Sequence, residues 1–143
     1  MIERIVPCPY CGNHATLVGG ARIYPSRPDL FGLHFWLCAP CNAYVGCHKA
    51  GEWIPGVGHS DGTLPFGTLA DAKLRAARKR AHAAFDPLWK SRQMKRRSAY
   101  QWLANRLGKQ LEDCHISMFD VGECAEVVKL CGQIAARYAA TEE

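Results

Sequence analysis

The sequence has no stretch approaching the roughly 18 uninterrupted apolar residues that a membrane-spanning helix needs. Its first residues, MIERIVPCPYCG, contain no apolar run as long as that of a signal peptide, and they reach a pair of cysteines at once. It also lacks internal repeats and low-complexity tracts. These absences argue against a membrane protein, and we expect a cytoplasmic protein with no membrane partner.

The sequence also has little that would support catalysis. It contains no glycine-rich phosphate-binding loop, and no paired carboxylates stand out in its neutral parts. Cys47 and Cys114 each precede a histidine, but adjacent residues of a strand point to opposite faces, so a thiol and its neighbouring imidazole could not easily pair. We therefore favour a protein that is not an enzyme. A nuclease-like enzyme using residues around Cys47, His48 and His115 is the weakest alternative.

The composition is that of a globular chain with two dissimilar parts. The 143 residues are about one domain's length, and 48% of them are apolar, which is enough for a modest core. Residues 1–65 are rich in Gly, Pro, Cys and aromatic residues, whereas residues 66–143 carry helical patterns. We expect these parts to be two modules, packed together as one unit.

The first part predicts short strands rather than helices. Gly19 and Gly20 are typical of a hairpin turn, and residues 51–67 form a Gly- and Pro-rich loop. A fold of such short strands has little core and needs an additional cross-link, for which a metal ion is the natural choice. The predicted strands are residues 15–18, 21–24, 33–38 and 43–47.

The second part predicts three helices. The first helix begins at the N-cap residue Thr68 and ends before Pro87, because proline disfavours helical geometry in the residue before it. The second helix covers about residues 94–107. The third follows Asp120, which forms a capping box with Glu123 three residues later.

Four of the eight cysteines are spaced as zinc ligands. Cys8 and Cys11 form one C-x2-C pair, and Cys38 and Cys41 form another. Two tight turns of this kind close a tetrahedral site of four thiolates, the usual structural zinc arrangement. The sequence therefore predicts one structural Zn²⁺ with no open coordination position.

Two alternatives to zinc stay open. Paired knuckles of this kind also hold iron in rubredoxin-like sites, and the spacing does not separate the two metals. The four cysteines could instead be buried thiols or disulfides, although the repeated C-x2-C spacing favours a metal.

The other four cysteines have no such spacing. A second metal site could be assembled from Cys47, His48, Cys114 and His115. Neither Cys–His pair has the spacing of a known metal-binding pair, so packing roles are the better interpretation. Cys124 and Cys131 lie on the apolar stripe of the third helix and are interpreted as small core residues.

Basic residues are concentrated in the middle of the chain. Residues 73–97, called the basic belt below, hold ten Lys and Arg residues and one acidic residue. Such a concentration is what the neutralisation of phosphates requires, and a nearby aromatic ring could stack on an exposed base. The candidate contact residues are Arg75, Arg78, Lys79, Lys90, Arg92, Lys95, Arg96 and Arg97.

The basic belt does not by itself require nucleic acid. It could be an ordinary solvated helix surface, or it could pair with the acidic residues of the segment 110–143. It could also be a basic face that docks on an acidic protein of a host cell.

Several segments together resemble one family. They are CPYCG at 8–12, CAPCNAYVGCH at 38–48, GTLADAKLRAARKRAHAAFDPLW at 67–89, AYQWLA at 99–104 and CHISMFD at 114–120. The chain resembles an uncharacterised family of zinc-finger-containing domains from bacteria, phages and prophages. The resemblance implies zinc on the four paired cysteines and a small accessory protein for DNA metabolism or interference with a host system. It implies no activity. Residues 8–48 alone are also similar to the zinc ribbons of topoisomerase tails.

These observations predict an α+β fold, with an N-terminal zinc ribbon of short antiparallel strands packed on a three-helix C-terminal part. The leading functional hypothesis is an accessory protein of the phage or prophage type that binds nucleic acid, DNA ahead of RNA, through the basic belt. The rival hypothesis is a protein–protein interaction module that inhibits or modulates a host protein.

Overall fold

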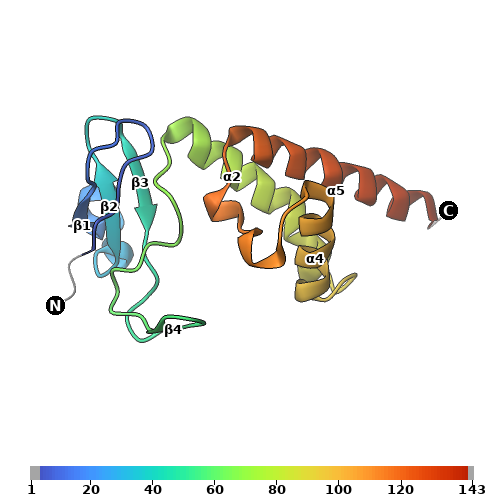
Figure 1. Cartoon of the computed structure of the whole chain (residues 1–143), viewed down its shortest axis with the longest axis horizontal. Helices are drawn as coiled ribbons and strands as arrows, with labels where there is room; N and C mark the ends of the chain where they lie inside the picture. Colours follow the sequence, from blue (N-terminus) through green and yellow to red (C-terminus); the bar gives the residue numbers. More distant parts are fainter. Residues whose placement is uncertain (1–3, 142–143) are drawn as a thin grey trace. The chain divides into compact units, whose positions relative to one another are not determined.

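A computed structural model describes residues 4–141 and, among these, the side chains up to residue 134. The fold is α+β as predicted, with short antiparallel strands in the N-terminal half and helices in the C-terminal half (Figure 1). The chain divides into two compact units, Met1–Ala72 and Lys73–Glu143, which we call the N-terminal unit and the C-terminal unit. The domain boundary at residue 65 and the packing of one module on the other stay predictions.

The N-terminal unit is built on a three-stranded antiparallel sheet. Strand β2 (His34–Cys38) lies between β1 (Thr16–Gly19) and β3 (Ala43–Gly46). Four consecutive residues of β2, from Phe35 to Cys38, are buried, as expected of a central strand covered on both faces. The indole Nε1 of Trp36 donates a hydrogen bond of 2.7 Å to the carbonyl oxygen of Thr63, which links the segment 51–67 to the sheet.

The prediction of a hairpin at Gly19 and Gly20 was wrong. Residues 21–24 do not form a strand; the chain instead enters a single helical turn, α1 (Gly20–Ile23), and β1 pairs with β2. The reason is a close backbone approach, since a Cβ on Gly20 would lie only 1.8 Å from the carbonyl oxygen of Leu30. Gly20 therefore serves tight packing rather than a two-residue turn.

The segment 51–67 contains a small hairpin that the loop prediction missed. Strands β4 (Trp53–Ile54) and β5 (Gly58–His59) pair in antiparallel register. Gly56 and Gly58 have φ values of +81° and +105°, a region that favours glycine in a tight turn. Strands of two residues carry no periodicity in the sequence, so composition alone suggested a loop.

The first long helix begins later than predicted. Ala70 exchanges two backbone hydrogen bonds of 3.0 Å with Tyr44, so this part of the chain extends the edge of the sheet. Helix α2 (Ala72–Phe85) therefore starts directly after Asp71, and Thr68 is not its N-cap. The predicted end of the helix before Pro87 is confirmed.

Three further helices follow in the C-terminal unit. They are α3 (Pro87–Lys90), α4 (Arg96–Leu107) and α5 (Val121–Thr141), and the short helix α3 was not predicted. Two 3-10 turns, Leu111–Asp113 and Ile116–Met118, connect α4 to α5. The largest fully buried side chains of this unit include Phe85, Leu103, Ile116, Phe119 and Val127.

The start of α5 confirms the predicted capping box. The backbone N–H of Glu123 donates to Oδ1 of Asp120 at 2.8 Å, and the backbone N–H of Asp120 donates to Oε1 of Glu123 at 3.1 Å. Each side chain thus satisfies a backbone donor that the helix leaves unpaired.

Among the described residues, no helix is long and apolar enough to cross a bilayer.

The close approach at Gly20 gives a test of the fold. A Gly20→Ala substitution places a methyl group against the Leu30 backbone, and we expect the free energy of unfolding to fall by about 2 kcal/mol or more. Gly32→Ala is the matched control, because no atom lies within 4 Å of its added Cβ. Urea unfolding of the two zinc-loaded variants would measure the change in the free energy of unfolding for each substitution. Equal midpoints for the two variants would contradict the proposed packing.

Candidate metal centre

The first pair of cysteines lies in a tight turn near the N-terminus. The backbone N–H of Cys8 donates to the Asn13 carbonyl, and the N–H of Gly12 donates to the Cys8 carbonyl, both at 2.8 Å. Gly12 has a φ of +79°, which a residue with a side chain rarely adopts. The turn thereby holds Cys8 and Cys11 at one end of the sheet.

The second pair lies where β2 turns into β3. Cys38 is the last residue of β2 and pairs with Ala43, so Cys41 sits within the connecting turn. Asn42 adopts a φ of +50°, a left-handed geometry that asparagine tolerates better than most residues. The sheet register therefore sets the position of the second pair.

The four sulfur atoms lie where a single metal ion could bind them all. The Sγ atoms of Cys8, Cys11, Cys38 and Cys41 all lie within 4.8 Å of one another, and those of Cys11 and Cys38 are 3.7 Å apart. A tetrahedron with Zn–S bonds of about 2.3 Å has sulfur atoms about 3.8 Å apart. The geometry fits, and we assign one structural Zn²⁺ to these four cysteines.

The electrostatics of the cluster also favour a cation. The hydrogen bond with Cys11, together with burial, raises the pKa of the Cys41 thiol to about 12. The pKa of Cys11 is lowered, chiefly by a hydrogen bond from the backbone of Asn13. Four thiolates this close repel one another, so a divalent cation is needed for all of them to be ionised.

The site is structural because it closes the core of its unit. Four thiolates complete a tetrahedral zinc site, leaving no position for a substrate or an activated water. Cys8 and Cys38 are also part of the buried cluster of the N-terminal unit. The other members of that cluster are Ala15, Trp36, Ala43, Cys47 and Leu69.

The four candidate ligands of the possible second metal site belong to different units, two to each. Cys47 is buried and its pKa is raised to about 11 by burial, while His48 hydrogen-bonds through Nδ1 to Glu52 and packs against Phe66. Cys114 is buried in the C-terminal unit, and the adjacent His115 is exposed. Neither unit by itself supplies more than two of the four ligands, so this site stays a prediction.

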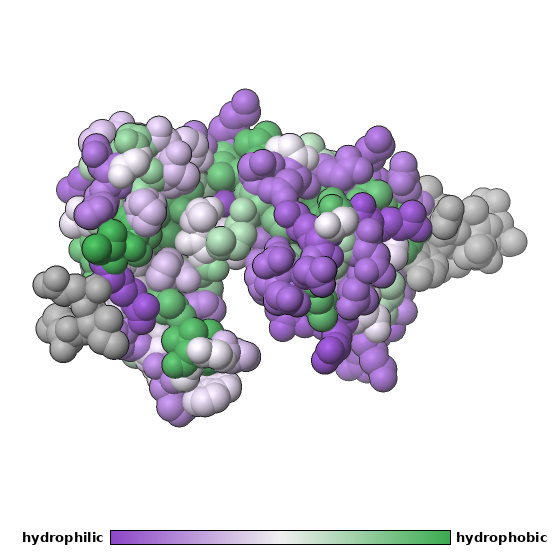
Figure 2. Space-filling view, in the orientation of Figure 1, coloured by the Kyte–Doolittle hydropathy of each residue, from purple (hydrophilic) through white to green (hydrophobic). Residues whose placement is uncertain are grey.

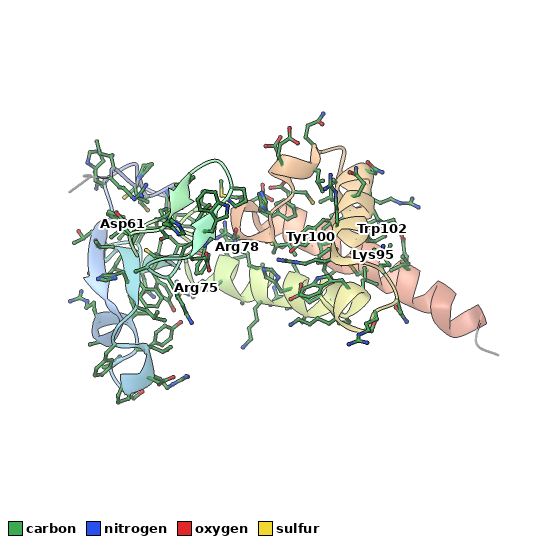
Figure 3. All side chains as sticks on the ribbon, turned by 90° about the horizontal axis from the view of Figure 1, so that it is seen from below. Asp61, Arg75, Arg78, Lys95, Tyr100 and Trp102 are labelled. Atoms are coloured by element: carbon green, nitrogen blue, oxygen red, sulfur yellow. The ribbon has the colours of Figure 1, made fainter. Side chains whose placement is uncertain are left out.

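One residue of the predicted binding face has a structural role instead. Arg78 is only 9% exposed, and its Nε donates a 3.0 Å hydrogen bond to the Phe119 carbonyl, so we remove it from the candidate surface (Figure 3). The charge count could not reveal this burial, because Arg78 falls between Leu74 and Ala81 on the buried side of α2. Arg75 is half-buried.

The remaining candidate residues lie at the surface. Lys79 on α2, Lys90 on α3 and four residues around the start of α4 are exposed: Arg92, Lys95, Arg96 and Arg97. Lys90 lies 3.9 Å from a carboxylate oxygen of Asp86. Among the described residues, no ion pair joins a basic residue of 79–97 to an acidic residue of 110–134.

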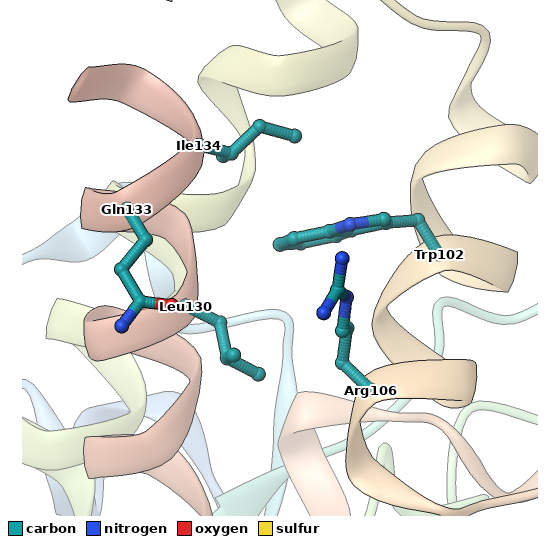
Figure 4. A pocket seen from close by; sticks show the side chains of 5 residues that line it. All are labelled: Trp102, Arg106, Leu130, Gln133 and Ile134. Atoms are coloured by element: carbon teal, nitrogen blue, oxygen red, sulfur yellow. The ribbon is translucent and has the colours of Figure 1, made fainter. Parts of the chain in front are cut away.

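Two hollows in the described part of the C-terminal unit were not suggested by the sequence. One, of about 360 Å³, lies between α4 and α5, where Trp102 and Arg106 face Leu130, Gln133 and Ile134 (Figure 4). The other, of about 460 Å³, lies beside the first turns of α4. Its lining residues are Arg96, Arg97, Tyr100, Leu111, Cys114 and His115.

Comparison with known proteins supports the zinc assignment. The model of a family described as a zinc-finger-containing domain matches residues 4–134. No curated protein and no solved structure matches the chain. The family match includes both cysteine pairs and the basic belt.

Metal analysis tests the site directly. We expect about one equivalent of zinc per chain, and we expect Cys8→Ser or Cys41→Ser to lose it and to unfold the N-terminal unit. Cys131→Ser, in the C-terminal unit, is the control and should retain the metal. Two equivalents would instead support the second site, and one equivalent of iron without zinc would contradict the zinc assignment.

Zinc affinity should also depend on pH. The metal binds thiolates, and in the cluster without metal the pKa of Cys41 is raised to about 12, so protons compete with zinc. We expect the apparent affinity, measured by competition with a chromogenic chelator, to fall roughly tenfold or more for each pH unit between pH 8 and pH 6. A pH-independent affinity would be inconsistent with thiolate ligands.

Proposed function

The chain belongs to the family of zinc-finger-containing domains, and from this premise we propose that it binds nucleic acid through the basic belt while zinc maintains its fold. The zinc site is saturated by protein ligands, so function is better sought elsewhere on the chain. In this proposal the belt contacts phosphates, with DNA favoured over RNA. An accessory role in a phage or prophage is part of the same proposal.

The observation that carries this proposal is the charge at the start of α4. Lys95 precedes the helix, Arg96 and Arg97 begin it, and the first turn contains no acidic residue and no side-chain cap. Positive charge at a helix N-terminus opposes the helix dipole and costs about 0.3–1 kcal/mol. A phosphate from a partner would neutralise these residues and accept hydrogen bonds from the backbone N–H groups of the first helical turn. Cations clustered at a helix N-terminus, where acidic residues are normally favoured, are typical of a binding site.

The surroundings of the belt support the same function. In Figure 2 the visible surface of the C-terminal unit is mostly hydrophilic, with no large apolar patch on that face. Lys79, Lys95 and Arg97 are exposed, and no ion pair of the described residues includes them. Cations without an intramolecular partner can release counterions on binding, which drives association with nucleic acid.

A protein-interaction module is the second candidate. The β4–β5 hairpin exposes two apolar side chains, Trp53 in β4 at 64% and Val57 in the connecting turn at 58%. Exposed aromatic residues of this kind are frequent anchors at protein interfaces. An acidic host protein that docks on the basic belt, as the sequence predicts, would lose binding when belt lysines are changed. A host protein that instead uses this hairpin should lose binding in Trp53→Ala and keep it when belt lysines are changed.

The salt dependence of binding tests the leading candidate. In a gel-shift assay, we expect the zinc-loaded protein to slow the migration of random-sequence nucleic acid at low salt. The affinity should fall steeply as the salt concentration rises. A Lys79→Gln, Lys95→Gln double variant should weaken binding to all sequences and reduce the salt slope by about 2. The exposed Lys129 on α5 provides the matched control, because Lys129→Gln makes the same kind of change outside the belt. No shift at low salt with zinc-loaded protein would refute the proposal.

A further inference from the structure

We infer that the hollow beside the first turns of α4 holds one unpaired base together with its adjacent phosphate, so that the protein prefers single-stranded nucleic acid. This inference rests on the proposed function and specifies its ligand. The hollow has a volume of about 460 Å³, within the range of small-ligand sites. It is lined by Arg96, Arg97, Tyr100, Leu111, Cys114 and His115, with no acidic side chain among them.

Arg96 is held in place by aromatic rings. Its guanidinium carbon lies 5.1 Å from the ring centroid of Trp89 and 5.6 Å from that of Tyr100. These cation–π contacts restrict the position of the guanidinium, while its N–H groups can still donate to an oxyanion. Arg97 is exposed and adds a second cation at the same hollow. The two arginines therefore provide a phosphate site that is partly ordered before the ligand binds.

Tyr100 supplies an aromatic surface beside these cations. Its ring contacts Phe85 edge to face, with centroids 4.8 Å apart and an interplanar angle of 63°, and Phe85 is fully buried. The Tyr100 ring is thus fixed by the core, while the residue remains half-buried and lines the hollow. A fixed ring is suited to stack on a base, because it loses little conformational freedom on binding.

The rest of the lining suits an aromatic ligand with a negative charge. Leu111 is half-buried and offers an apolar contact to a base. Burial raises the pKa of the Cys114 thiol, so this residue stays neutral and does not repel a phosphate. His115 is exposed at the same hollow and can donate a hydrogen bond.

This combination of groups distinguishes single strands from duplexes. In a duplex the faces of each base are covered by neighbouring bases, so only the phosphates could reach Arg96 and Arg97. An unpaired base can leave its stack and contact Tyr100 while its phosphate remains with the arginines. Stacking on one aromatic residue contributes about 1–3 kcal/mol, which is roughly a 5- to 150-fold gain in affinity for the single strand.

Fluorescence anisotropy with a labelled oligothymidine and a hairpin duplex of equal charge tests the inference on the full zinc-loaded chain. We expect the single strand to bind about tenfold more tightly or better. Equal affinities would overturn this inference and leave the proposed function standing. If neither probe bound, both this inference and the proposed function would be overturned. Competition by free thymidine monophosphate at concentrations similar to the strand would overturn the strand preference and assign the hollow to a free nucleotide.

Variants at the hollow locate the effect. Tyr100→Leu should reduce affinity for the single strand about tenfold and affinity for the duplex by clearly less, because the duplex loses only the ordering of Arg96 and no stacked base. Tyr100→Phe retains the ring and should bind like the wild type. Lys79→Gln is the control outside the hollow, and it should weaken both probes equally. A Tyr100→Leu protein that bound both probes normally would overturn the inference.

Cross-linking gives a measurement that does not depend on the stability of a variant. A single strand containing 5-iodouracil, irradiated with the unmodified protein, should cross-link within the segments 96–100 and 111–115 that form the hollow. Cross-links confined to other segments would overturn the assignment even if the protein preferred single strands.

Discussion

The coordination of one metal ion by four thiolates is the interaction on which the N-terminal unit depends. Its sheet has three strands of four or five residues, and few large side chains are buried around it. A core of this size cannot offset the conformational entropy of the chain, so the metal contributes the missing free energy. Because Cys8 and Cys38 lie in that core, coordination and apolar packing stabilise the same turns.

The need for zinc also bears on where function is located. A saturated site has no position for a substrate, and the residues around it serve to close the core. The C-terminal unit builds its own buried core from Phe85, Leu103 and Phe119. It can therefore keep cations at its surface, including three at the start of α4 that oppose the helix dipole. This separation of a stabilising metal from a charged surface is the basis of the proposed function.

The aromatic residues of the C-terminal unit relate its core to its surface. Phe85 is buried and orients Tyr100, and Tyr100 and Trp89 together order the guanidinium of Arg96. A charged residue held in this way loses less conformational freedom on binding than a free surface arginine would. The proposed base-binding hollow depends on this chain of contacts, which begins in the core and ends at a cation.

The sequence by itself determined the features that depend on local spacing. Two C-x2-C pairs specify a four-thiolate site, Pro87 ends α2, and Asp120 with Glu123 caps α5, because each requires only residues that are close in the chain. The tertiary structure decided features that depend on distant contacts. Gly20 became part of a helical turn because the backbone at Leu30 lies against it, and the start of α2 moved because Ala70 pairs with Tyr44.

The same distinction holds for the candidate surface. The number of cations in the basic belt could be read from the sequence, but not which of them is buried. Arg78 became a core residue because the carbonyl of Phe119, 41 positions away, accepts its hydrogen bond. The hollow beside α4 likewise joins residues 96–100 to residues 111–115 across a turn. Local chemistry fixed the metal site, and only the packing of distant segments decided which charges remain available to a partner.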